Sequence, residues 1–253
     1  MSIILLFFVS IVAGLVGALA GMGGGVILIP VLTLFGMDIK QAIGLSIISV
    51  IATSSGAAAA YVRDRITNLK ICMSLEMFTL AGAMAGASIS VVSDQQFLFV
   101  MLGVVLLISS AGLWNQKVEI STAREYQDPA SRWLELEGEY FDRSTDRTVM
   151  YKARRVHLGA PLMFVAGLMA GLLGIGAGAL KVLIYDVVMD LPSKVSVTTS
   201  NLMIGVTALA GTSVYLAAGL INPGLAAPAI LGVVTGAFIG TRLLVRLPNK
   251  MVR

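Results

Sequence analysis

Long runs of apolar residues, separated by short polar segments, account for most of the chain. Most of them reach the roughly 17–25 residues that a helix needs to cross a bilayer. Runs 23–36 and 176–190 are shorter and each follows a glycine cluster, so we expect short or broken helices there. The nine runs are 3–20, 23–36, 41–61, 71–92, 96–114, 157–173, 176–190, 197–217 and 224–244. This pattern predicts an all-α, polytopic integral membrane protein.

Composition supports that prediction and isolates one polar segment. The chain is 57% hydrophobic and 13% charged, whereas soluble domains carry about 25% charged residues. Residues 115–156 hold 8 Lys+Arg and 8 Asp+Glu, half of all the charges in the chain. We therefore expect a first transmembrane repeat at 1–114, a polar insert at 115–156 and a second transmembrane repeat at 157–253.

The insert is too short for a sizeable core of its own. Segments 134–141 and 148–155 alternate loosely between apolar and polar residues, and turn-forming residues separate them. This predicts a small β-hairpin. We expect it to sit in a solvated linker, with a regulatory or partner-binding role as an open alternative.

The two apolar parts of the chain are copies of one unit. Gly21–Gly25 aligns with Gly174–Gly178 at an offset of 153 residues. After one residue of slip, further identical pairs follow at an offset of 154: Ser46 and Ser200, Thr53 and Thr207, Tyr61 and Tyr215, Asn68 and Asn222, Gly82 and Gly236, Gly86 and Gly240.

The charges flanking the copies predict opposite orientations. Loop 62–70 carries three basic residues and its counterpart 216–224 carries none. At the other end, 88–95 has none, whereas Arg242, Arg246, Lys250 and Arg253 follow the second copy. The positive-inside rule then gives two inverted repeats, an outside N-terminus and a cytoplasmic insert and C-terminus. Whether 23–36 and 176–190 cross fully or only dip into the membrane stays open.

Several classes of function are excluded. The sequence has no Walker motif, no paired acid and base, and no metal-ligand cluster, so we expect neither an enzyme nor a cofactor or metal. Val26 breaks the dinucleotide-binding glycine spacing after Gly21–Gly25, and Cys72 is the single cysteine. The basic residues flank apolar segments, as orientation signals do, which argues against a nucleic-acid partner.

The glycine clusters are the first candidate binding elements. Glycine breaks a helix and lets backbone approach a ligand closely. The half-helix that restarts there directs N–H groups and a positive dipole end toward an anion. Tight helix packing is the open alternative. The candidates are Gly23, Gly24, Gly25, Gly176 and Gly178, whereas the pairs Gly82/Gly86 and Gly236/Gly240 predict packing.

The first cluster, with Pro30 and the Ser46 segment after it, resembles the opening motif of the TauE/SafE family of sulfite and organosulfonate exporters. The repeated cluster at 174–178 strengthens the resemblance, which covers nearly the whole chain outside 115–156. It implies transport, usually export, of sulfite, sulfoacetate or a related sulfur-containing anion across the inner cell membrane. Ala177 of the second copy stands at the position that Gly24 occupies in the first copy, and the second copy has no counterpart of Pro30.

Polar residues in the apolar runs complete the candidate site. Ser46 and Ser49 share a helical face with Thr53, and Thr199, Ser200 and Asn201 lie on the corresponding helix of the second copy. They could surround an oxyanion, or hydrogen-bond backbone instead. Lys181 could offset an anion's charge, the alternatives being pairing with Asp186 or snorkelling. Glu76 could carry a proton, but we expect an interfacial, hydrated carboxylate.

The sequence therefore predicts a secondary transporter of small sulfur-containing oxyanions that works by alternating access. Its expected partners are a small anionic substrate and the lipid bilayer. The driving force is either a proton gradient, with a coupling proton as a further partner, or the gradient of the anion itself. An anion channel is one alternative. Another is a membrane scaffold or sensor that acts through the 115–156 insert.

Overall fold

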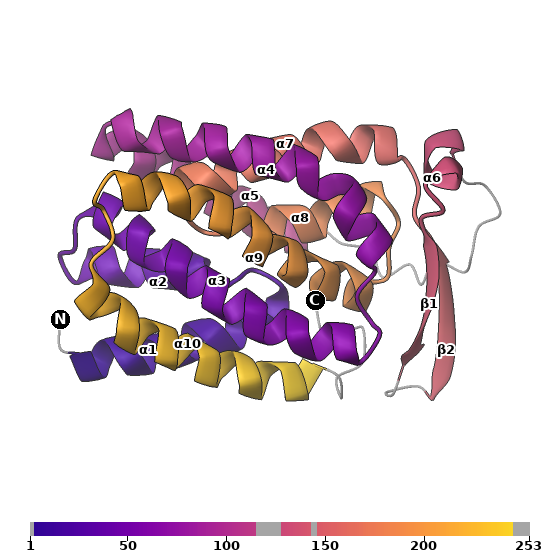
Figure 1. Ribbon diagram of the computed structural model, residues 1–253, viewed down its shortest axis with the longest axis horizontal. Helices are drawn as coiled ribbons and strands as arrows, with labels where there is room; N and C mark the ends of the chain where they lie inside the picture. Colours follow the sequence, from indigo (N-terminus) through magenta and orange to yellow (C-terminus); the bar gives the residue numbers. More distant parts are fainter. Residues whose placement is uncertain (1–2, 115–127, 143–145, 245–253) are drawn as a thin grey trace.

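The computed structural model describes residues 3–114, 128–142 and 146–244. It is a bundle of long helices with one two-stranded hairpin at an end (Figure 1). Within the described residues, six helices are long and apolar enough to cross a membrane, which confirms a polytopic, all-α membrane protein. They are α1 (Ile3–Ala20), α3 (Ile39–Arg63), α4 (Leu69–Val92), α7 (Val156–Leu173), α9 (Ser193–Ala217) and α10 (Pro223–Leu244).

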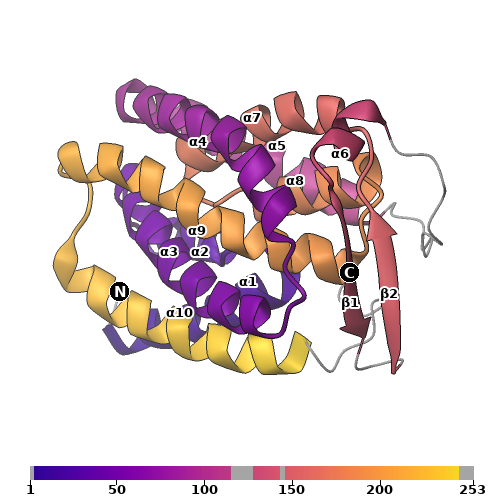
Figure 2. The same cartoon turned by 45° about the vertical axis from the view of Figure 1, so that its right-hand side comes forward.

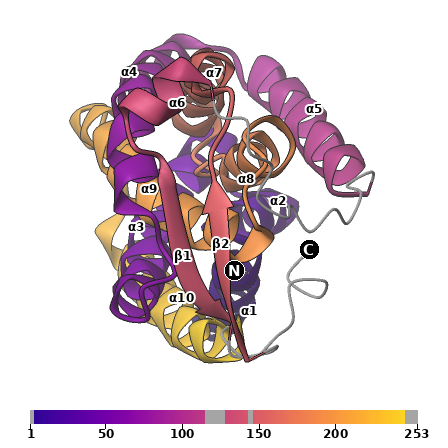
Figure 3. The same ribbon diagram turned by 90° about the vertical axis from the view of Figure 1, so that its right-hand side faces the viewer.

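The two short runs form short helices, as expected. Helix α2 (Gly25–Leu34) has 10 residues, or about 15 Å of length, roughly half a bilayer's hydrocarbon core. Helix α8 (Gly178–Leu183) continues into a π-helical turn, η1 (Ile184–Val188). Helix α5 (Gln95–Trp114) completes the first half of the chain and runs along one side of the bundle (Figure 3).

Polar caps fix where the helices begin. The Asp38 carboxylate accepts hydrogen bonds from the Lys40 and Gln41 backbone N–H groups at the start of α3. The Asn68 side chain accepts from the Ile71 N–H at the start of α4. Both side chains satisfy backbone donors that a helix end leaves without partners.

The first helix of each half packs along the helix of the other half that carries a predicted glycine pair, so that α1 packs along α10 and α7 packs along α4. A Cβ atom at Gly236 of α10 would lie 2.0 Å from the Ile11 carbonyl oxygen of α1. The equivalent Gly82 of α4 would place a Cβ 2.1 Å from the Phe164 carbonyl oxygen of α7. These helices touch backbone to backbone, which confirms the packing role predicted for the glycine pairs.

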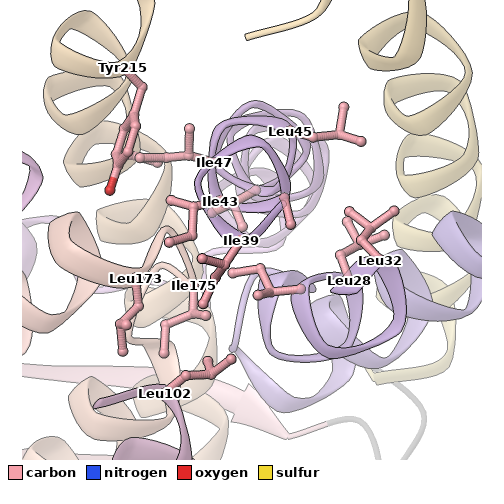
Figure 4. Packing of buried hydrophobic residues seen from close by; sticks show 14 of the residues in the cluster. Leu28, Leu32, Ile39, Ile43, Leu45, Ile47, Leu102, Leu173, Ile175 and Tyr215 are labelled. Carbon is pink, nitrogen blue, oxygen red and sulfur yellow. The ribbon is translucent and has the colours of Figure 1, made fainter. Parts of the chain in front are cut away.

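The central helices α3 and α9 are equivalent in the repeat and run antiparallel. Gly44 faces Leu220, Ile47 faces Gly211, and Ser54 faces Gly205, so one residue number rises as the other falls. Figure 4 shows α3 end-on with its buried Ile39, Ile43 and Ile47 inside the main apolar core. The helices that the sequence offset of 154 residues makes equivalent therefore run in opposite directions.

The hairpin covers the end of the bundle where α4 and α9 begin (Figures 2 and 3). Strands β1 (Glu137–Asp142) and β2 (Arg147–Lys152) pair antiparallel, as predicted, and a short helix α6 (Pro129–Trp133) precedes them. Leu136 and Tyr140 are buried in one cluster with Ile71 and Leu75 of α4. The solvated-linker expectation is therefore wrong for the described part of the insert.

Polar contacts fix the docked hairpin. The Lys194 ammonium of α9 lies 2.7 Å from the Asp142 carboxylate, and both side chains are 2% exposed. The Asn68 amide donates to the Tyr151 hydroxyl at 2.9 Å. Burial raises the pKa of Tyr151 more than this hydrogen bond lowers it, so the hydroxyl stays neutral. The hairpin and the first turns of α4 and α9 thus form one packed unit.

The buried Asp142–Lys194 pair gives a stability prediction. Replacing Asp142→Asn leaves the Lys194 charge buried without its counter-charge, which typically costs about 3–5 kcal/mol. Glu137→Gln is the matched control, because the Glu137–Lys152 pair is 3.8 Å apart with both side chains about half exposed and should contribute under about 1 kcal/mol. Thermal unfolding in detergent should show a much lower midpoint for Asp142→Asn only; equal midpoints would contradict the buried pair.

Candidate functional site

Each half contains one left-handed glycine turn between two helices. After α1, the chain turns through Gly23 and Gly24, with φ of 74° and 79°, before α2 starts. After α7, it turns through Gly174 and Gly176, with φ of 62° and 72°, before α8 starts. These angles suit glycine, because a Cβ atom makes them costly. Ala177 has a Cβ atom and nevertheless adopts a positive φ, of 45°.

The two turns meet in the centre of the molecule. A Cβ atom at Gly25 would lie 2.9 Å from the Ile175 Cα, and one at Gly178 would lie 2.0 Å from the Gly21 carbonyl oxygen. Gly23 and Gly176 both face the side chains of Val50 and Ile204, which are themselves equivalent positions of α3 and α9. The breaks of both halves therefore form one backbone-to-backbone junction, the glycine junction.

Two serines cross-link this glycine junction reciprocally. The Ser46 hydroxyl of the first half donates to the Gly174 carbonyl of the second at 3.0 Å. The Ser200 hydroxyl of the second half donates to the Gly21 carbonyl of the first at 3.1 Å. Each hydroxyl satisfies a carbonyl at the point where a helix has been interrupted. Both serines are fully buried.

The remaining hydroxyl and amide candidates also contact backbone. The Ser49 hydroxyl donates to the Leu45 carbonyl within its own helix. The Thr199 hydroxyl accepts from the Asn68 N–H at the start of α4. The Asn201 amide donates to the carbonyls of Ala18 and Val197, whereas its buried side-chain oxygen has no hydrogen-bond partner. Among these, Asn201 keeps an acceptor available beside the junction.

Lys181 is the charged group at this site. Its side chain is 0% exposed, so it does not snorkel, and its ammonium donates to the Thr207 hydroxyl at 2.7 Å rather than pairing with Asp186. Thr207 lies one turn after Ile204 on α9, and Ile204 contacts the glycine junction. The structure thus places the fully buried Lys181 side chain against Thr207, one helical turn from a residue that contacts the glycine junction.

Glu76 is the residue that sequence reasoning misplaced. It is 6% exposed, not interfacial, and its Oε1 atom lies 2.8 Å from the Thr207 hydroxyl. Glu76, Thr207 and Lys181 therefore form a continuous polar chain across α4, α9 and α8. Two features of the sequence indicated members of this polar chain. Thr207 repeats Thr53, and Glu76 is the single carboxylate in apolar run 71–92.

Comparisons with known proteins agree with this architecture. A family model described as "Sulfite exporter TauE/SafE" matches residues 6–253. The chain belongs to the TauE/SafE family. The resemblance found in the sequence is thereby confirmed, and this membership assigns the chain to membrane transport rather than to enzymatic catalysis.

Two curated proteins of Bacillus subtilis (strain 168) are similar over nearly their full length. The "Probable membrane transporter protein YunE" is 28% identical over 99% of this chain and 90% of its own length. The "Probable membrane transporter protein YdhB" is 22% identical over 99% of this chain and 92% of its own. No solved structure matches the chain.

The reciprocal serine bonds give a first site prediction. Ser46→Ala and Ser200→Ala should each lower the free energy of unfolding by about 1–3 kcal/mol, because each leaves a buried carbonyl without its donor. Similar losses are expected because the bonds are equivalent. Ser49→Ala is the control, since its hydroxyl bonds only its own helix. Thermal unfolding of the three variants measures this; a Ser49→Ala loss as large as the others would refute the cross-link.

The close approach of the two glycine turns gives a second site prediction. At Gly178→Ala the new methyl would overlap the Gly21 carbonyl oxygen, 2.0 Å away, and overpacking of this kind typically costs about 1–3 kcal/mol or more. Gly103→Ala, in α5, has nothing within 4 Å of its new methyl and should be neutral or slightly stabilising. The measurement is the yield and melting midpoint of purified protein. Equal behaviour of the two variants would mean that the junction is looser than described.

Proposed function

We propose that this protein is a secondary transporter of small sulfur-containing oxyanions, such as sulfite or sulfoacetate, which it exports across the cell membrane by alternating access. The anion binds beside the glycine junction, against the Lys181 ammonium. The single observation that carries this proposal is a fully buried lysine, Lys181, one helical turn after Gly178, where the second turn approaches the first.

A buried ammonium is costly unless its charge is compensated. Lys181 has three N–H donors, and Thr207 is its single hydrogen-bond partner in the part of the chain that the structure describes. Two donors thus stay available for a ligand. An oxyanion supplies both the negative charge and the acceptor atoms. The name of the matched family, sulfite exporter, supports a sulfur-containing anion and outward movement.

The other candidates then divide into two roles. Ser46 and Ser200 hold the two turns together through the carbonyls of Gly174 and Gly21. N–H groups at the start of α2, following Gly23, Gly24 and Gly25, add positive dipole character near the ligand. Gly176 and Gly178 let the second turn approach the first closely. Ser200 and Asn201 contact the end of α1 and the first turn from α9, whereas the neighbouring Thr199 binds the Asn68 N–H at the start of α4.

The antiparallel course of α3 and α9 supports inverted repeats in the membrane. In secondary transporters built from such repeats, the site lies near the midplane and one half rocks against the other. The hairpin end, with its neighbouring basic loop 62–70, would face the cytoplasm by the positive-inside rule. An anion channel would share this frame, but it would carry currents too large for a rocking cycle.

A sensor acting through the insert is the second candidate, and the buried Asp142–Lys194 pair favours it, since it ties the hairpin to the helix that carries Ser200. Deleting 118–150 separates the two functions. The deletion must be combined with Lys194→Met, because it would otherwise strand the Lys194 charge. A transporter keeps its flux, whereas a sensor loses its output.

Anion binding tests the proposal directly. Sulfite, sulfoacetate, thiosulfate, sulfate and acetate should be compared by thermal shift on detergent-purified protein. A ligand at 100 times its Kd stabilises the native state by about 2.7 kcal/mol, and we expect such a shift with sulfur anions. Lys181→Met should abolish it. The control Lys40→Met should retain it, because the Lys40 ammonium only caps the Val91 carbonyl.

Two results would contradict this proposal. One is the absence of a shift with every anion in the panel. The other is a full sulfoacetate shift in the Lys181→Met protein, which would place the site elsewhere.

A further inference from the structure

Glu76 is a buried carboxyl group with half of its hydrogen-bonding capacity unused. The residue is 6% exposed, and its Oε1 atom lies 2.8 Å from the Thr207 hydroxyl. Its Oε2 atom is buried and has no hydrogen-bond partner among the described residues, and the Thr79 hydroxyl is a further polar neighbour of the carboxyl group. An ionised carboxylate in this position leaves one oxygen without compensation, which is expensive in a low-dielectric interior. The cost of this burial indicates that the carboxyl group has a function.

The Thr207 hydroxyl can hydrogen-bond to Glu76 whether the carboxyl group is ionised or protonated. Its hydroxyl oxygen has three polar neighbours: the Lys181 ammonium at 2.7 Å, the Glu76 Oε1 atom at 2.8 Å and the Met203 carbonyl at 2.7 Å. A hydroxyl offers one donor and two acceptor lone pairs. Lys181 always donates, so the remaining donor and lone pair can be distributed in two ways.

When Glu76 is ionised, the Thr207 hydroxyl donates to it. When Glu76 is protonated and its proton lies on Oε1, Glu76 donates to Thr207, and the Thr207 hydroxyl turns to the Met203 carbonyl. No heavy atom has to move between these states. Within the described residues, Thr53, at the equivalent position of α3, donates to the Ser49 carbonyl of its own helix. The polar chain around Thr207 therefore has no counterpart around Thr53.

The groups around Glu76 select a proton rather than a metal cation. Lys181 faces it from α8, Tyr185 from η1 and Cys72 from its own helix. On the packed helices α7 and α9, His157 lies at an exposed end, Lys194 pairs with Asp142, and Tyr215 donates to the Gly171 carbonyl. Within the described ranges, no three His, Cys, Asp or Glu residues gather to hold a metal.

We propose that Glu76 binds the proton that travels with the transported anion. This rests on the proposed function. Protonation neutralises Glu76 and leaves the Lys181 charge unbalanced, so the anion binds beside it. Release of the proton restores the carboxylate, which then interacts with Lys181 through Thr207 and weakens anion binding. Proton and anion move in the same direction, which lowers by one the net charge that crosses the membrane.

Proteoliposomes loaded with a pH-sensitive dye test the coupling. In the wild type, an imposed gradient of [14C]sulfoacetate should drive a matching pH change in the lumen, in the presence of a potassium ionophore to clamp the voltage. Glu76→Gln should keep sulfoacetate exchange and lose the pH change. Thr207→Val should impair coupling severalfold, whereas the matched Thr53→Val should leave it unchanged.

Infrared difference spectroscopy tests the proton site without transport. A buried carboxyl group that takes up a proton on acidification gives a C=O stretching band, and we expect that band in the wild type, shifted in Thr207→Val and absent in Glu76→Gln. If Glu76→Gln does not fold, the band shift in Thr207→Val, absent from Thr53→Val, decides the assignment.

The outcomes separate the two proposals. Sulfoacetate flux without proton movement, or proton movement that persists in Glu76→Gln, overturns the proton site and leaves transport intact. No flux of sulfoacetate or any other panel anion in the wild type counts against the proposed function, and the infrared band then decides alone whether Glu76 takes up a proton. A band unchanged in both the Glu76 and Thr207 variants overturns the assignment.

Discussion

The backbone contact between the two glycine turns is the constraint on which the rest of this structure depends. Two interrupted helices can end inside a membrane only where their carbonyl and N–H groups find partners. Here each half supplies the partner for the other, because Ser46 donates to the Gly174 carbonyl and Ser200 donates to the Gly21 carbonyl. Neither turn could be stable without the opposite half, so the two repeats fold as one body around the glycine junction.

Charged side chains lie near this contact. Lys181 lies one turn into α8. The lysine is linked through Thr207 to Glu76, on a helix of the first half. This polar chain therefore spans both halves. The proposed transport by rocking halves and the proposed coupling to a proton both use this connection.

The helices and their approximate boundaries could be predicted from the sequence because they depend on local pattern. Apolar runs and glycine clusters each leave a signature in a single chain. The positions of α2 and α8, and the hairpin strands, followed from the same signals. The hydrogen bond from Ser46 to the Gly174 carbonyl could not be predicted. Contacts between distant helices depend on how the helices pack, and a single sequence does not show this.

Glu76 shows most clearly what could not be predicted from the sequence. Its place near the start of a helix suggested a hydrated carboxylate. In the folded protein its neighbours are Thr207 of α9, Lys181 of α8 and Tyr185 of η1. These helices are distant from Glu76 in the sequence, so the local pattern around the residue did not indicate that they would bury it.

The most direct test of the central claim is counterflow in proteoliposomes. External [14C]sulfoacetate is supplied to vesicles preloaded with unlabelled sulfoacetate. The account predicts transient, saturable accumulation of label that requires internal sulfoacetate and disappears in Lys181→Met while Lys40→Met retains it. Label entry that ignores internal sulfoacetate, or that proceeds equally without the Lys181 ammonium, would contradict alternating access at the glycine junction.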